Sequence, residues 1–161
     1  MSALPRPTPP AVSPEAQGAA GTPRLVDVRG PRVVAGVTAV VLALALVSGA
    51  GWLVAAQAAV FAVGACAGLR YAPYGVLFRV LVAPRLGPVQ DREPEAPVRF
   101  AQLVGLVFAA GGAAGYLLGA PLLGAVATGL ALVAALLNAA TGSCLGCELY
   151  LTVRRAQART V

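Results

Sequence analysis

Four apolar runs without a charged residue constrain this chain more than any other feature of its sequence. They cover residues 33–48, 52–69, 100–118 and 122–140. A helix that crosses the hydrocarbon layer of a bilayer needs about 20 apolar residues, with a range of about 17–25. The four runs are close to this length. We therefore expect an all-α fold, an integral membrane bundle of four transmembrane helices.

Short breaks of small residues separate the runs within each pair. Ser48-Gly49-Ala50-Gly51 divides the first pair, and Gly119-Ala120-Pro121 divides the second. One helix across both members of a pair would overshoot the bilayer, so each pair predicts a tight helical hairpin. Trp52 has the position of an interfacial aromatic anchor at its turn. Gln57 lies near the same turn and is expected to stand alone there, without another polar side chain beside it.

Glycines recur at helical spacing within the runs. Gly111, Gly115 and Gly119 are four residues apart, and Gly64 and Gly68 repeat the pattern in the second run. Residues four apart share one helix face, where the absence of side chains lets a neighbouring backbone approach closely. The pattern predicts helix packing without functional content.

The overall composition supports lipid as the solvent of this chain. Of its 161 residues, 58% are hydrophobic and 11% are charged, whereas a soluble domain carries about 25% charged residues. A net charge of +6 often indicates a nucleic-acid partner. Here, however, the basic residues are all arginines that flank the apolar runs and form no stripe. The expected partner is the lipid bilayer, and no nucleic acid is expected.

The arginines also predict the orientation. They lie before the first run, between residues 70 and 99, and after the fourth run, while both short breaks carry no charge. By the positive-inside rule, both termini and the loop 70–99 are cytoplasmic, in a multi-pass protein of the plasma membrane. Within this loop, the apolar segment 74–82 is too short to span the bilayer, so it predicts a cytoplasmic interfacial helix.

The ends of the chain are expected to lie outside the bundle. Residues 1–23 are rich in proline and predict a disordered cytoplasmic tail. The membrane domain then covers residues 24–155, and 156–161 form a C-terminal tail. The first run, with the basic residues before it, loosely resembles a cleaved signal peptide. The preceding segment is long for that, and a second run follows at once, so we expect an uncleaved chain.

The polar residues within or beside the runs gather near the predicted inner leaflet. The chain has no His and three Cys, which excludes imidazole bases and haem with a His ligand. Cys66 lies one helical turn before Arg70, and Gln102 and Asn138 lie near the inner ends of their runs. Polar groups exposed to lipid are costly, so both amides are expected to face other helices. No cofactor is expected.

Cys144 and Cys147 form the sharpest signal. Residues three apart on a helix share a face, so the two sulfurs are able to meet. Ser143 is a candidate N-cap for a helix that starts here, and the positive end of the helix dipole would then favour the Cys144 thiolate. Glu148 opposes a second negative charge beside Cys147, although it could relay protons.

Three interpretations of this pair stay open. The first is a redox dithiol, with Cys144 and Cys147 exchanging with thiol proteins or carrying sulfur. The second is a soft-metal site that adds Cys66; no metal is expected, because a structural zinc site normally has four ligands. The third is a pair of small hydrophobic side chains in a non-catalytic assembly protein or small carrier. A homo-oligomer is compatible with each of them.

Several segments resemble a known family. They are Pro31-Arg32, Arg70-Tyr71-Ala72-Pro73-Tyr74-Gly75, Arg99-Phe100-Ala101-Gln102 and the ending from Leu137 to Tyr150. Together they resemble a family of four-helix bacterial membrane proteins of unknown function that is common in actinobacteria, over about residues 26–155. Its most specific part is the ending Cys-Leu-Gly-Cys-Glu-Leu-Tyr. Members are often encoded near thioredoxin-like or rhodanese-like proteins, so the resemblance implies a cytoplasmic partner of that kind and a role in thiol or sulfur traffic.

Overall fold

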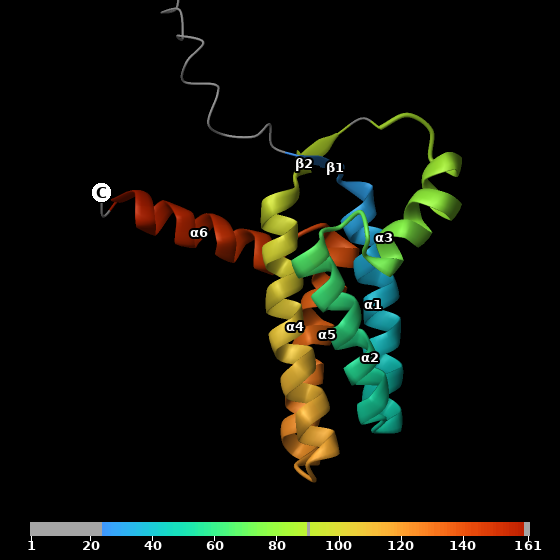
Figure 1. Cartoon of the computed structure of the whole chain (residues 1–161), viewed down its shortest axis with the longest axis vertical. Coiled ribbons are helices and arrows are strands. Elements are labelled where there is room, and N and C mark those ends of the chain that lie inside the picture. Colours follow the sequence, from blue (N-terminus) through green and yellow to red (C-terminus); the bar gives the residue numbers. More distant parts are fainter. Residues whose placement is uncertain (1–23, 90, 160–161) are drawn as a thin grey trace, which may run out of the picture.

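Four helices lie side by side and form the body of the protein (Figure 1). The computed structural model describes residues 24–89 and 91–159, so the predicted tail 1–23 lies outside the described residues. Helix α1 contacts α2 and α5, and α4 contacts α2, α5 and the C-terminal helix α6. The bounds of these helices are α1 Arg29–Ser48, α2 Gly51–Ala62, α4 Glu95–Leu117, α5 Pro121–Thr141 and α6 Leu145–Arg159.

The two predicted helical hairpins are present, and their turns lie at the same end of the bundle (Figure 1). Gly49 follows α1 with a φ of 64°, and Gly119 follows α4 with a φ of 81°. Both angles lie in the left-handed region, which glycine adopts without steric penalty. Pro121 then occupies the first position of α5, where its missing N–H removes no helical hydrogen bond.

Three of the described helices are long and apolar enough to cross a bilayer, namely α1 with 20 residues, α4 with 23 and α5 with 21. The fourth helix of the bundle is shorter. It consists of the 12 residues of α2 and the 5 residues of the π-helical turn η2 (Val63–Ala67). It ends before Gly68, whose φ of 97° interrupts the predicted run 52–69. At 1.5 Å per residue this helix measures about 26 Å, slightly less than the hydrocarbon core.

The outside of the bundle is apolar, as expected of a surface in contact with lipid. Large side chains on three helices are exposed, among them Val40, Leu44, Val107, Leu130 and Val133. A soluble monomer rarely exposes apolar patches of this extent. The helical fold predicted from the sequence is therefore confirmed, and three of its helices are long and apolar enough to span a membrane.

Small residues bring α4 and α5 into close contact, at the predicted position Gly115 and also at Gly112, which was not predicted. A Cβ atom on Gly115 would lie 2.4 Å from the backbone nitrogen of Gly124, and one on Gly112 would lie 2.7 Å from Oγ1 of Thr128. Gly111, by contrast, has nothing within 4 Å. The predicted stripe is wrong at Gly111 and at the turn residue Gly119, because spacing alone does not say which face of a glycine-rich helix meets a neighbour.

The arginine-bearing segments gather at the other end of the bundle (Figure 1). There β1 (Leu25–Asp27) pairs with β2 (Arg92–Pro94) in an antiparallel ribbon, with Val26 opposite Glu93. This ribbon was not predicted, since strands of three residues, one of which contains Pro94, are too short to show an alternation of apolar and polar residues. Helix α4 begins at Glu95, five residues before the predicted start at Phe100, and α6 continues to Arg159, beyond the expected start of the C-terminal tail.

The expected short helix between the two hairpins is also present. Helix α3 (Pro73–Leu77) continues through the turns η3 (Phe78–Val82) and η4 (Ala83–Arg85). It packs on α1, and Phe78 is only 5% exposed. A Cβ atom on Gly30 of α1 would lie 3.4 Å from the Phe78 ring. One face of this segment is therefore part of the protein core.

Gln57 has a partner, so the expectation that it stands alone is wrong. The Gln57 side chain is 1% exposed, and its Oε1 accepts a hydrogen bond of 2.9 Å from the Tyr74 hydroxyl. Nε2 of Gln57 has no partner among the described residues. The contact depends on α3 folding back against the bundle, which the position of Gln57 in its apolar run did not reveal.

Candidate functional site

The loop between α5 and α6 positions the cysteine pair. Helix α5 is capped at its C-terminus by Gly142, which has a φ of 77° and donates its N–H to the Asn138 carbonyl. The Ser143 N–H donates a hydrogen bond of 3.1 Å to the Thr141 hydroxyl oxygen. From α1, the Arg32 guanidinium donates to the Ala140 carbonyl at 3.2 Å. A cation at this position complements the negative end of the α5 dipole and places positive charge beside the loop.

Cys144 is the N-cap residue of α6. Its carbonyl accepts the Glu148 N–H at 3.0 Å, and its Sγ accepts the Cys147 N–H at 3.3 Å. This is the third N–H of the helix, the group that an N-cap side chain normally satisfies. The expected cap, Ser143, is wrong by one residue, because the turn with Thr141 uses the Ser143 backbone before the helix begins.

The sulfurs of Cys144 and Cys147 lie at disulfide distance. The Cα atoms of the pair are 5.1 Å apart, and both residues are partly exposed. The expectation that this spacing brings the two sulfurs together is therefore confirmed. The pair lies at the N-terminus of α6, where part of each side chain remains accessible.

Two contacts hold the first turns of α6 against α4. A Cβ atom on Gly146 would lie 2.6 Å from both Cα and Cβ of Ala101, so only glycine fits at this position. The rings of Tyr150 and Phe100 pack with their centroids 5.7 Å apart. Beyond Tyr150, residues 151–158 are exposed, and α6 extends sideways away from the bundle (Figure 1).

An inner cavity of about 320 Å³ lies between the helices of the bundle, and Cys144 is one of the residues that line it. Its walls are mostly apolar and include the rings of Phe61 and Phe108. No charged side chain lines it within the described part of the chain. The polar side chains that line it are Thr38, Gln102, Asn138 and Cys144. The structure thus brings Cys144 together with both amides that the sequence singled out.

The other sequence-predicted residues lie apart from this cavity. Glu148 is exposed on α6 and does not line it. Cys66 is an exposed free cysteine on η2, and its carbonyl accepts a hydrogen bond of 3.1 Å from Arg99. In residues 24–89 and 91–159, no group of three Cys, Asp or Glu side chains comes close enough to hold a metal ion. The alternative metal site with Cys66 is therefore not assembled.

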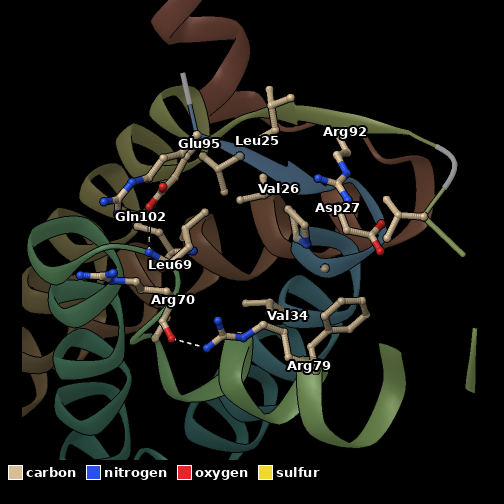
Figure 2. A pocket seen from close by; sticks show the side chains of 18 residues that line it. Leu25, Val26, Asp27, Val34, Leu69, Arg70, Arg79, Arg92, Glu95 and Gln102 are labelled. Carbon is tan, nitrogen blue, oxygen red and sulfur yellow. Dashed lines mark hydrogen bonds between the residues drawn. The ribbon is translucent and has the colours of Figure 1, made fainter. Parts of the chain in front are cut away.

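Sequence reasoning missed a second, outer cavity of about 570 Å³ beneath the β1–β2 ribbon (Figure 2). It lies between α1, α3 and α4, and Gln102 lines both cavities. Figure 2 shows the Arg79 side chain reaching toward the Arg70 carbonyl, to which it donates a hydrogen bond. The ionisable side chains that line this cavity are Arg24, Asp27, Arg70, Arg79, Arg92 and Glu95. The density of arginine in the loop was visible in the sequence, but the strand pairing that closes the cavity was not.

The acidic groups near the outer cavity have distinct surroundings. The Arg29 side chain donates to Asp27, 3.0 Å away in an ion pair, and this hydrogen bond holds the pKa of the Asp27 carboxyl below its usual value. Burial raises the pKa of Glu93. Oε1 of Glu95 accepts a hydrogen bond of 3.1 Å from the Leu69 N–H, and this contact joins the segment just after η2 to the start of α4.

A family model matches most of the chain. The model described as "Domain of unknown function (DUF4395)" matches residues 26–155. The chain belongs to the DUF4395 family. The DUF4395 match includes the four bundle helices, the cysteine pair and most of α6, and it confirms the family resemblance seen in the sequence. No curated protein and no solved structure matches the chain.

Proposed function

We propose that this protein is a membrane-anchored dithiol–disulfide exchanger. The Cys144–Cys147 pair would act at the cytoplasmic face, with a thioredoxin-like or rhodanese-like protein as its partner. The observation that carries the proposal is the pairing of two partly exposed sulfurs at the N-terminus of α6. A purely structural role does not require a disulfide to cap a helix at the edge of the bundle.

The orientation is part of this proposal. Arginines occur at the start of α1, in the loop 70–99 and in α6, all at one end of the bundle, whereas the two turns at the other end are uncharged (Figure 1). The positive-inside rule then favours a cytoplasmic location for the arginine-bearing end and both termini. Four crossings are required for this arrangement, and the helix Gly51–Ala67 lies at the short end of the spanning range.

The local geometry suggests how the pair would react. In the reduced protein, the Cys147 N–H and the positive end of the α6 dipole stabilise a thiolate on Cys144. This thiolate attacks one sulfur of a partner disulfide, which forms a mixed disulfide and releases the other partner sulfur. Cys147 then attacks Sγ of Cys144 and releases the second partner sulfur. One disulfide forms, one breaks, and two electrons pass to the partner; the reverse reaction follows the same path.

Trapping of the mixed disulfide tests this mechanism. In a Cys147→Ser variant, Cys144 should accumulate a covalent adduct with an oxidised thioredoxin, because the resolving thiol is absent. A Cys144→Ser variant should form about tenfold less adduct or none. Cys66→Ser is the matched control, and it should behave as the unmodified protein does. Equal alkylation rates at Cys144 and Cys66 would contradict the assignment of Cys144 as the nucleophile.

A labelling experiment tests the orientation separately. A membrane-impermeant maleimide, added to intact cells after mild reduction, should leave Cys144 and Cys147 unmodified and should label them once the membrane is permeabilised. Modification of the pair from outside would place the dithiol at the opposite face and would refute a cytoplasmic partner.

A further inference from the structure

We propose that the inner cavity binds the ring of a lipid-soluble quinone, which exchanges two electrons with the Cys144–Cys147 pair. This inference rests on the proposed function, because it names the co-substrate of the same dithiol. It follows from three properties of the inner cavity: its polarity, its position along the bundle and its access to lipid.

The lining of the cavity matches a flat, uncharged ring with two carbonyl oxygens. Small-molecule sites are mostly apolar, have volumes of about 300–1,000 Å³ and carry a few polar groups that orient the ligand. The cavity volume of about 320 Å³ lies at the lower end of this range. Its wholly uncharged lining disfavours phosphate, sulfate or other ions, since burying an unpaired charge is costly.

Three polar side chains are available to a ligand in this cavity. Thr38, Gln102 and Asn138 line it, and the Gln102 amide also lies against Gly64 of η2. Thr38 is 3% exposed, so its hydroxyl has little access to solvent elsewhere. Amide and hydroxyl groups donate hydrogen bonds, and quinone oxygens accept them.

The cavity connects the middle of the bundle with the cysteine pair. Thr38 lies near the centre of α1 and Leu130 near the centre of α5, whereas Cys144 lies at the end of the bundle, and all three residues line the cavity. Phe108 and Leu130 also line it and are 37% and 54% exposed on the apolar outside of the bundle. A ligand dissolved in the bilayer would thus reach Cys144 from the lipid side.

The electron balance of the proposed step is complete. A partner dithiol first reduces the Cys144–Cys147 disulfide by the exchange described above. The two thiols of the pair then give two electrons and two protons to the quinone. Two S–H bonds break, one S–S bond forms, and the two oxygens of the quinone become the hydroxyls of a quinol. Over the whole cycle the partner protein is oxidised and the quinone is reduced.

The binding test uses the full chain in phospholipid nanodiscs and an azido-substituted decylubiquinone as a photoaffinity probe. Labelling of residues that line the inner cavity should occur even in a Cys144→Ser, Cys147→Ser double variant, because binding does not require the sulfurs. Excess decylubiquinone should suppress the labelling. If only added phospholipid suppresses the labelling, an acyl chain occupies the site. If the probe does not label the cavity at all, the quinone does not bind there. Either result would overturn the quinone proposal.

The redox test compares two reactions of the same pre-reduced protein. Ala134→Phe fills the cavity, and a Gln102→Leu, Asn138→Leu variant removes both amides; each should slow decylubiquinone reduction by about tenfold or more. Both variants should keep their rate of exchange with thioredoxin. Val133→Phe, an exposed neighbour of Ala134 outside the cavity, is the matched control and should change neither rate.

The outcomes separate the two proposals. Unchanged quinone reduction in both cavity variants would overturn the quinone site, while normal thioredoxin exchange would leave the proposed function standing. If the unmodified protein shows no exchange with thioredoxin while the probe still labels the cavity, the proposed function is refuted. The cavity would then be a quinone-binding site without a thiol partner.

Discussion

Substitution of Gly146 by alanine tests whether the close contact between α6 and α4 holds the cysteine pair in place. The added Cβ atom would lie 2.6 Å from Cα and Cβ of Ala101. Both are atoms of a packed helix and cannot rotate away, so α6 must shift outward by close to 1 Å to reach ordinary van der Waals separation. The first turn of α6 would then lose its fit against α4.

Two opposing effects determine the size of the change. Overpacking in a well-packed contact costs about 1–3 kcal/mol. Alanine in place of glycine within a helix gains about 0.8–1.0 kcal/mol of helix propensity. Because the obstructing atoms are rigid, we expect a cost near the upper part of that range, and a net loss of about 1–2 kcal/mol in the docking of α6. This corresponds to about a 5- to 30-fold change in the docked population.

Hydrogen–deuterium exchange of segment 145–150 in nanodiscs measures this loss directly. Amide exchange there should accelerate by about the same 5- to 30-fold in Gly146→Ala. Gly129→Ala on α5 is the control, because a Cβ atom at Gly129 meets nothing within 4 Å; it should leave exchange in α6 unchanged. Unchanged or slower α6 exchange in Gly146→Ala would show that α6 is not docked on Ala101.

Two further predictions concern the arginine-bearing end and the bundle interior. Tyr74→Phe removes the hydroxyl that donates to the buried Gln57 Oε1 and should lower stability by about 1 kcal/mol in thermal unfolding, whereas the exposed Tyr71→Phe should not. The Asp27 carboxylate has a lowered pKa in the folded protein, so it stabilises the fold. This stabilisation is fully present at pH values above the unfolded-state pKa of about 3.9 and is lost as the pH falls through the folded-state pKa. Asp27→Asn should remove this part of the acid sensitivity, and a variant that loses stability in parallel with the unmodified protein would contradict it.

The parts of the fold that follow from local sequence were predictable. Uncharged runs of near-spanning length predicted the four bundle helices, and breaks at Gly49 and Gly119 predicted their turns, since a left-handed backbone angle is a property of the residue itself. The spacing of Cys144 and Cys147 predicted that their sulfurs meet, because residues three apart on a helix share a face.

Features that depend on contacts between distant segments escaped prediction. The hydrogen bond from Tyr74 to Gln57 joins residues 17 positions apart, and the ribbon joins Val26 to Glu93. Neither leaves a periodic signal in the sequence. The same limitation explains the N-cap: Ser143 is the better cap by residue type, but its backbone is bound in the turn with Thr141, which leaves Cys144 to begin the helix.

By itself, the sequence determined that this chain is an apolar helical bundle with its arginines at one end and a cysteine pair near that end. Hydrophobicity and charge act on each segment separately, so their pattern is sufficient for this conclusion. Only the tertiary structure decided that Cys144 lines an uncharged cavity together with Thr38, Gln102 and Asn138. A cavity is the space left between helices from different parts of the chain, and its shape depends on how their side chains pack together.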